Sequence, residues 1–113
     1  MRTVTLGIAS RESVGKRFLE ASTGSPQGTF ISFDSPERLF KVLSGKRWHL
    51  LKVMTGSAPI SIREAARRVG RDVKAVYADV QVLLNAGILY KTGEGRIVFP
   101  FDAIHVDFML KAA

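Results

Sequence analysis

Alternating apolar and polar residues mark both ends of the chain. Val4, Leu6 and Ile8 alternate with polar or small residues, which predicts a short strand with one buried face. Every second residue from 104 to 110 is apolar as well, which predicts a similar strand. Isolated strands of this length are unstable, so we expect both of them, with a helix predicted after Ser10, to form a dimerisation surface.

Helical spacing dominates the middle of the chain. A β-prone stretch at 29–33 precedes Ser35-Pro36-Glu37, a typical helix start, and the helix is expected to run through Leu43. A second helix is predicted from Arg47 to Met54, closed by Gly56. We interpret Trp48 in this helix as a core residue.

Two further helices are predicted around a glycine turn. Ser61 and Glu64 have the spacing of a capping box, in which each side chain satisfies a backbone donor of the other residue. Gly70 ends this helix and Asp72 can cap the next one. The predicted apolar face of the first helix comprises Ile62, Ala65, Ala66 and Val69, and that of the second comprises Val73, Val76, Val80, Leu83 and Leu84. A short turn between two such helices is typical of helix-turn-helix proteins.

A glycine-rich hairpin follows the second helix. The β-prone segments 88–91 and 96–99 flank Thr92-Gly93-Glu94-Gly95, so we expect two antiparallel strands joined by a tight turn. Beside a helix-turn-helix, such a hairpin would be a wing. The predicted fold class is therefore α+β: a winged helix-turn-helix at 29–101, preceded by a strand and helix at 1–28 and followed by a strand at 102–113.

Positive charge is concentrated in the same region. The chain has 17 Lys and Arg against 10 Asp and Glu, a net charge of +7. Eight basic and two acidic residues lie between Lys46 and Lys74, so this quarter carries +6. Clustering of arginine favours a polyanionic partner over a solvated surface.

Candidate DNA contacts follow from the helical wheel. The second helix leaves one sparsely charged face opposite its apolar stripe, which suits insertion into a major groove. The predicted base-reading residues are Lys74, Tyr77, Ala78 and Gln81. The predicted phosphate ligands are Lys46, Arg47, Arg63, Arg67, Arg68 and Arg71, with Lys91 and Arg96 on the wing.

Enzymatic and metal-binding motifs are incomplete in this sequence. Ser13 and Lys16 match a Ser-x-x-Lys pattern without its companion motifs, and the Gly-Lys pairs lack the rest of a phosphate loop. The chain has no cysteine, and we interpret His49 as a partly buried helix residue and His105 as a strand surface residue. We expect a cytoplasmic protein that is not an enzyme, with no cofactor, no metal and no membrane association.

Several long segments carry a family resemblance. FISFDSPERLFKVLSGKRWHLLKVM, SIREAARRVGRDVKAVYADVQVLLNAGIL and IHVDF resemble a family of MarR-like winged-helix regulators of bacteria and archaea, many of which are regarded as antitoxins. The resemblance covers about residues 30–108. It implies a homodimer that represses its own operon, and a toxin protein as a further partner.

The predicted function is sequence-specific binding of duplex DNA as a transcriptional regulator and autorepressing antitoxin. The alternative is a protein-interaction module, in which the winged helix holds a toxin or a component of the transcription machinery with little DNA specificity. RNA binding is disfavoured, since no aromatic platform for unstacked bases is evident.

Overall fold

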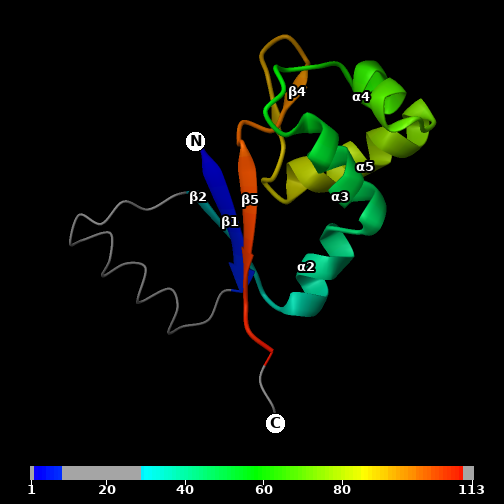
Figure 1. Cartoon of the computed structure of the whole chain (residues 1–113). Coiled ribbons are helices and arrows are strands. Elements are labelled where there is room, and N and C mark those ends of the chain that lie inside the picture. Colours follow the sequence, from blue (N-terminus) through cyan, green and yellow to red (C-terminus); the bar gives the residue numbers. More distant parts are fainter. Residues whose placement is uncertain (1, 9–28, 111–113) are drawn as a thin grey trace.

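Three parallel strands from distant parts of the chain form the main sheet. The computed structural model describes residues 2–8 and 29–110, and the predicted helix after Ser10 lies outside them. Strand β1 (Thr3–Ile8) is central, between β2 (Thr29–Phe33) and β5 (Ala103–Asp107). Figure 1 shows the three strands side by side. Both predicted terminal strands are confirmed; the segments 1–28, 29–101 and 102–113 each contribute one strand to this sheet.

The partners of β1 come from its own chain. Val4 pairs with Thr29 on one side and with Ile104 on the other, so both edges of β1 are occupied. The N-terminal strand therefore finds both of its partners within the chain. In the described sheet, only the outer strands β2 and β5 have an edge that could pair with a second copy. Val4 and Leu6 are fully buried, as the alternation predicts.

Close packing around β1 requires a glycine. A Cβ atom on Gly7 would lie 2.8 Å from the main-chain oxygen of Asp107 and 2.7 Å from the ring of Phe30. Real Cβ atoms do not approach other atoms so closely, and a main-chain atom cannot move aside as a flexible side chain can. Gly7 therefore lets β5 and Phe30 pack against the central strand.

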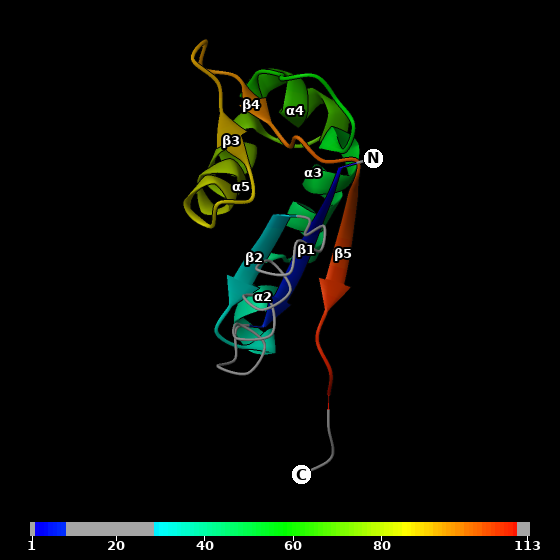
Figure 2. The same cartoon turned by 90° about the vertical axis from the view of Figure 1, so that its left-hand side faces the viewer.

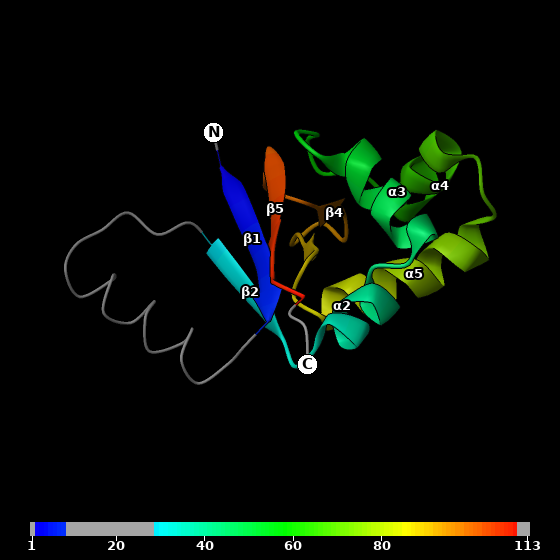
Figure 3. The ribbon, with the colours of Figure 1, turned by 60° about the horizontal axis from the view of Figure 1, so that its bottom comes forward.

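A layer of helices lies on one side of this sheet, as Figure 3 shows. Helix α2 (Pro36–Val42) begins as predicted, with Oγ of Ser35 accepting a hydrogen bond from the amide of Arg38. Helix α3 (Gly45–Met54) begins two residues before the predicted Arg47, since Ser44 occupies its N-cap. Gly56 follows α3 with a φ of 71°, which confirms its capping position. No described helix is long and apolar enough to cross a bilayer.

The interpretation of Trp48 as a core residue is wrong. Helix α3 packs into the core through Leu50, Leu51 and Met54, whereas Trp48 is 42% exposed. Residues four apart share a helix face, so Trp48 and Lys52 lie together beside the buried stripe. The interpretation of His49 as partly buried is also wrong, because its side chain is exposed, while His105 is exposed as expected.

Helices α4 (Ile62–Val69) and α5 (Val73–Asn85) lie next to α3, and Ala65, Ala66 and Val76 are buried between them. The prediction that Val73 belongs to the buried face is wrong, since its side chain is 42% exposed. It is the first residue of α5, directly after the N-cap Asp72. Val76, Val80 and Leu83 of the predicted stripe are confirmed as fully buried.

A short hairpin completes the described structure. The ladder between β3 (Tyr90–Lys91) and β4 (Ile97–Val98) is shorter than the predicted strands, because Ile88, Leu89 and Phe99 turn into the core instead of pairing. Ile97 and Ile60 also exchange backbone hydrogen bonds of 2.8 and 2.9 Å. The residues before α4 therefore hold β4 on its second side.

Candidate nucleic-acid interface

Local sequence signals fix the angle between α4 and α5. Gly70 ends α4 in the left-handed conformation at φ 67°, and the amide of Arg71 donates to the main-chain oxygen of Ala66 at 3.1 Å. Oδ2 of Asp72 then accepts a hydrogen bond from the amide of Lys74 at 3.0 Å and begins α5. The three-residue turn is as predicted.

The predicted capping box is half formed. Oγ of Ser61 accepts a hydrogen bond from the amide of Glu64 at 3.1 Å, as expected. The carboxylate of Glu64 does not return to Ser61 but binds Arg67 and Arg68, with 2.8 Å from Nε of each arginine to a carboxylate oxygen. Hydrogen bonds from Arg67 and then Arg68 lower the pKa of Glu64 to about 2. The two arginines compete successfully for this carboxylate because they follow it by one helical turn.

The N-terminal half of α5 presents an open surface to solvent. Lys74, Tyr77 and Ala78 are exposed, and Gln81 is half-buried on the same face. Tyr77 is 52% exposed. Within the described residues, the side chains of Lys74, Tyr77 and Gln81 make no hydrogen bond or ion pair, so their polar groups are available to a ligand. The four predicted base-reading residues thus share one accessible face.

The six predicted phosphate ligands fall into two groups. Lys46 and Arg63 are exposed, as is Arg67, whose side chain is 73% accessible beside Glu64. Arg68 donates to Glu64 and also to Oγ of Ser57 at 3.0 Å, and it stays 35% accessible. These four cationic groups can reach a polyanion.

The second group, Arg47 and Arg71, is bound by an aspartate that the sequence analysis missed. Nε of Arg47 donates to Oδ1 of Asp79 at 3.0 Å. Nη1 of Arg71 lies 2.8 Å from Oδ2 of Asp79, in an orientation that makes an ion pair without a hydrogen bond. Only 22% and 20% of the two arginine side chains are accessible, so we assign both to the scaffold instead of to phosphate contact.

Asp79 connects three elements through these arginines. Nη1 of Arg47 also donates to the main-chain oxygens of Lys41 and Val42, at 3.1 and 3.2 Å. These carbonyls end α2, so one guanidinium links α2, α3 and α5. The sequence does contain a signal for this network. Asp79 falls within the apolar stripe that includes Val76 and Leu83, and a buried carboxylate needs a cationic partner.

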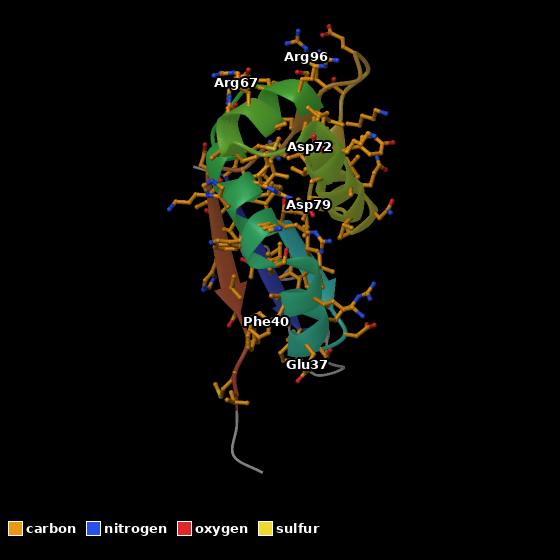
Figure 4. The ribbon with its side chains drawn as sticks, turned by 90° about the vertical axis from the view of Figure 1, so that its right-hand side faces the viewer. Glu37, Phe40, Arg67, Asp72, Asp79 and Arg96 are labelled. Carbon is orange, nitrogen blue, oxygen red and sulfur yellow. The ribbon has the colours of Figure 1, made fainter. Side chains whose placement is uncertain are left out.

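A threonine organises the hairpin turn. The hydroxyl of Thr92 accepts hydrogen bonds from the amides of Glu94 and Arg96, at 3.3 and 3.1 Å, and Gly95 adopts a φ of 80°. Lys91 and Arg96 on either side of the turn are exposed. Figure 4 shows Arg96 and Arg67 at the same end of the molecule, with Asp72 below them. The hairpin therefore adds cationic side chains to the end that carries α4.

In the described part of the chain, no three His, Cys, Asp or Glu side chains gather closely enough to hold a metal ion.

Comparison with protein families gives a match over much of the candidate interface. The model of the family HVO_A0114 matches residues 42–106, from the end of α2 to β5, and so includes both helices of the candidate interface and the hairpin. Neither curated proteins nor solved structures gave a significant match. Since the matched segment spans more than half of the chain, this protein belongs to the HVO_A0114 family.

Proposed function

We propose that this protein is a sequence-specific duplex DNA-binding regulator of transcription in the cytoplasm. In this proposal α4 and α5 form a helix-turn-helix, the β3–β4 hairpin is its wing, and α5 enters the major groove. The observation that carries the proposal is the free face of α5 with Lys74, Tyr77, Ala78 and Gln81, beside the cationic side chains of α4. Such a face combines groove-compatible side chains with charges that can contact the flanking phosphates.

The resemblance to MarR-like regulators supports a more specific role. A symmetric dimer would place two recognition helices in successive major grooves, roughly 34 Å apart, and would bind a palindromic operator. As an autorepressing antitoxin, the protein would bind the DNA upstream of its own gene and a toxin. The dimer, the operator and the toxin belong to this proposal.

The decisive experiment compares the operator with random DNA. Fluorescence anisotropy at two salt concentrations measures binding of the full chain to duplex DNA from its own upstream region and to a random duplex. We expect a clear preference for the upstream duplex. Binding of both duplexes in the non-specific range, roughly 10⁻⁴ to 10⁻⁶ M, would reject the proposal.

Gln81→Ala then tests base reading. A bidentate amide contact contributes about 1–3 kcal/mol of discrimination, so the variant should bind the operator more weakly and random DNA almost unchanged. Asn85→Ala is the matched control, because Asn85 is the last residue of α5, about 18 Å from the start of the helix. Equal losses on both duplexes for Gln81→Ala would contradict a base-reading role.

A protein-interaction module remains the second candidate. The observation that favours it is a set of large apolar side chains exposed on elements other than α5, among them Trp48 on α3 and Phe40 on α2, at 42% and 59%. A chain that captures a protein partner equally well with and without operator DNA, and shows no operator preference, would support this candidate.

A further inference from the structure

Within the described residues, strand β5 has an open edge. It pairs with β1 on one side, and no other described strand pairs with it, as Figure 2 shows at the border of the sheet. Edge strands of soluble proteins usually carry lysine, proline or a bulge that prevents pairing with another chain. The residues of β5 are Ala103, Ile104, His105, Val106 and Asp107, so the strand has no lysine and no proline, and Asp107 at its end is its one acidic residue.

The apolar residues of β5 are also more exposed to solvent than the residues of β1 with which they pair. Ile104 and Val106 pair with Val4 and Leu6, so all four side chains lie on the face of the sheet that carries the helices. Val4 and Leu6 are fully buried, whereas Val106 is 39% exposed and Ile104 is half-buried. The helices therefore cover the apolar residues of β1 on this face but leave those of β5 partly exposed to solvent.

Further apolar surface continues from this edge. Ile104 lines a pocket of about 240 Å³ together with Trp48, Lys52 and Thr55 of the α3 region. Beyond β5, Phe108 packs edge-to-face against Phe40, with ring centroids 5.7 Å apart. Met109 and Leu110 then extend away from the fold, 75% and 94% exposed. One additional strand beside β5 would cover the pocket and the uncovered face together.

We propose that this strand is β5 of a second copy, paired antiparallel about His105. The strand has five residues with His105 at its centre, so this register pairs all of them. Ile104 then faces Val106 of the second copy on the helix side, next to the pocket. On the other side, each Asp107 lies diagonally across from His105 of the second copy, so acidic and basic groups alternate around the axis.

The palindromic arrangement of side chains favours a second copy over a different protein. Two β-branched residues flank His105 symmetrically, and β-branched side chains pack well against their neighbours on a pleated sheet. In the same register, Phe108, Met109 and Leu110 lie opposite Asp102, Phe101 and Pro100 of the second copy, just before its β5, so the exposed Met109 and Leu110 gain neighbours there. A foreign strand would need to reproduce both features.

The symmetry also suits the proposed function, and the inference deepens the dimer on which that function rests. Antiparallel pairing of identical edge strands puts the two-fold axis perpendicular to the sheet. Since the helices lie on one side of the sheet, both copies of α5 would lie on the same side of the dimer, where one DNA duplex can reach them.

Cysteine crosslinking tests the register. The chain has no cysteine, so any disulfide formed by a single-cysteine variant must join the same position of two copies. Directly opposed side chains have Cβ atoms about 4.5–5.5 Å apart, close enough for a disulfide after small adjustment. His105→Cys should therefore give a covalent dimer on oxidation. Ala103→Cys is the control, because its two copies would lie about 13 Å apart along the strands and should stay uncrosslinked.

Light scattering after size exclusion tests the edge itself. The full chain should be a dimer across a dilution series, and Val106→Lys should shift it to monomer by placing a charge in the paired face. Tyr90→Lys is the control, since Tyr90 is similarly exposed at 42% but lies in the hairpin.

A monomeric wild-type protein would overturn the proposal, as would a dimer that resists Val106→Lys and forms no disulfide in the His105→Cys variant. A monomer that still prefers the operator would overturn the dimer alone and leave the proposed DNA binding intact.

Discussion

Nε of Arg47 on α3 donates a 3.0 Å hydrogen bond to Oδ1 of Asp79 on α5, with 11% of the Asp79 side chain accessible. Arg71, in the turn before α5, lies against the other oxygen of the same carboxylate. The orientation of α5 thus depends on a buried carboxylate that binds two arginines from outside this helix. A charge that holds the helix and a charge that contacts DNA should respond differently to mutation.

Asp79→Asn should destabilise the fold. The substitution leaves two half-buried guanidinium groups without their counter-charge. Removing one partner of a fully buried pair costs about 3–5 kcal/mol of unfolding free energy, and we expect a loss near the lower end of this range because both arginines keep some contact with water. Urea unfolding monitored by circular dichroism measures the change. Asp34→Asn, at an exposed position before α2, is the control and should be neutral within about 0.5 kcal/mol. A neutral Asp79→Asn would show that the network contributes nothing net.

The arginines should separate into two classes in DNA titrations. Arg63→Ala and Arg67→Ala should each weaken binding to operator and random duplex alike, and each should lower the slope of log K against log salt by about 1. Arg47→Ala should lower stability and leave that slope unchanged, because its guanidinium is occupied by Asp79. An equal change of slope in all three variants would contradict this division.

Acid stability should depend on Glu64. Its pKa is lowered from 4.5 to about 2 by Arg67 and Arg68, so its ionised form favours the folded state. For a lowered pKa the stabilisation is fully present above 4.5 and is lost as the pH falls from there through about 2. Thermal unfolding over this range should show a shallower loss for Glu64→Gln than for wild type. Glu94→Gln, at an exposed hairpin position, should retain the wild-type dependence.

Gly70→Ala should destabilise the turn between α4 and α5. Nothing lies within 4 Å of an added Cβ atom, so the effect comes from the left-handed backbone at φ 67°, which costs an alanine about 1–2 kcal/mol. Gly45→Ala is the matched control, since it has equal space and lies in α3 without a positive φ. It should leave stability unchanged or raise it by about 0.5–1 kcal/mol. Equal effects at the two positions would contradict the argument.

Local chemistry made several of these features predictable from the sequence. Ser35, Ser61 and Asp72 each accept a hydrogen bond from an amide two or three residues ahead, and Gly70 ends α4 in the left-handed conformation. Such signals act over a few residues, as do the apolar stripes of α4 and α5. The free face of α5 follows from the same periodicity.

Only the tertiary structure decided which charges are free and which apolar residues are covered. Arg63 and Arg47 look alike in the sequence, but Asp79 comes within reach of Arg47 and not of Arg63, because α3 packs against α5, 32 residues further along the chain. Trp48 is exposed beside Ile104 of β5, the last strand of the described sheet, and this neighbour depends on which strands pair. By itself the sequence determined the helices, their caps and the turn, since these depend on neighbouring residues. The ion network and the open edge depend on the order of strands and helices in space, which no short stretch of sequence contains.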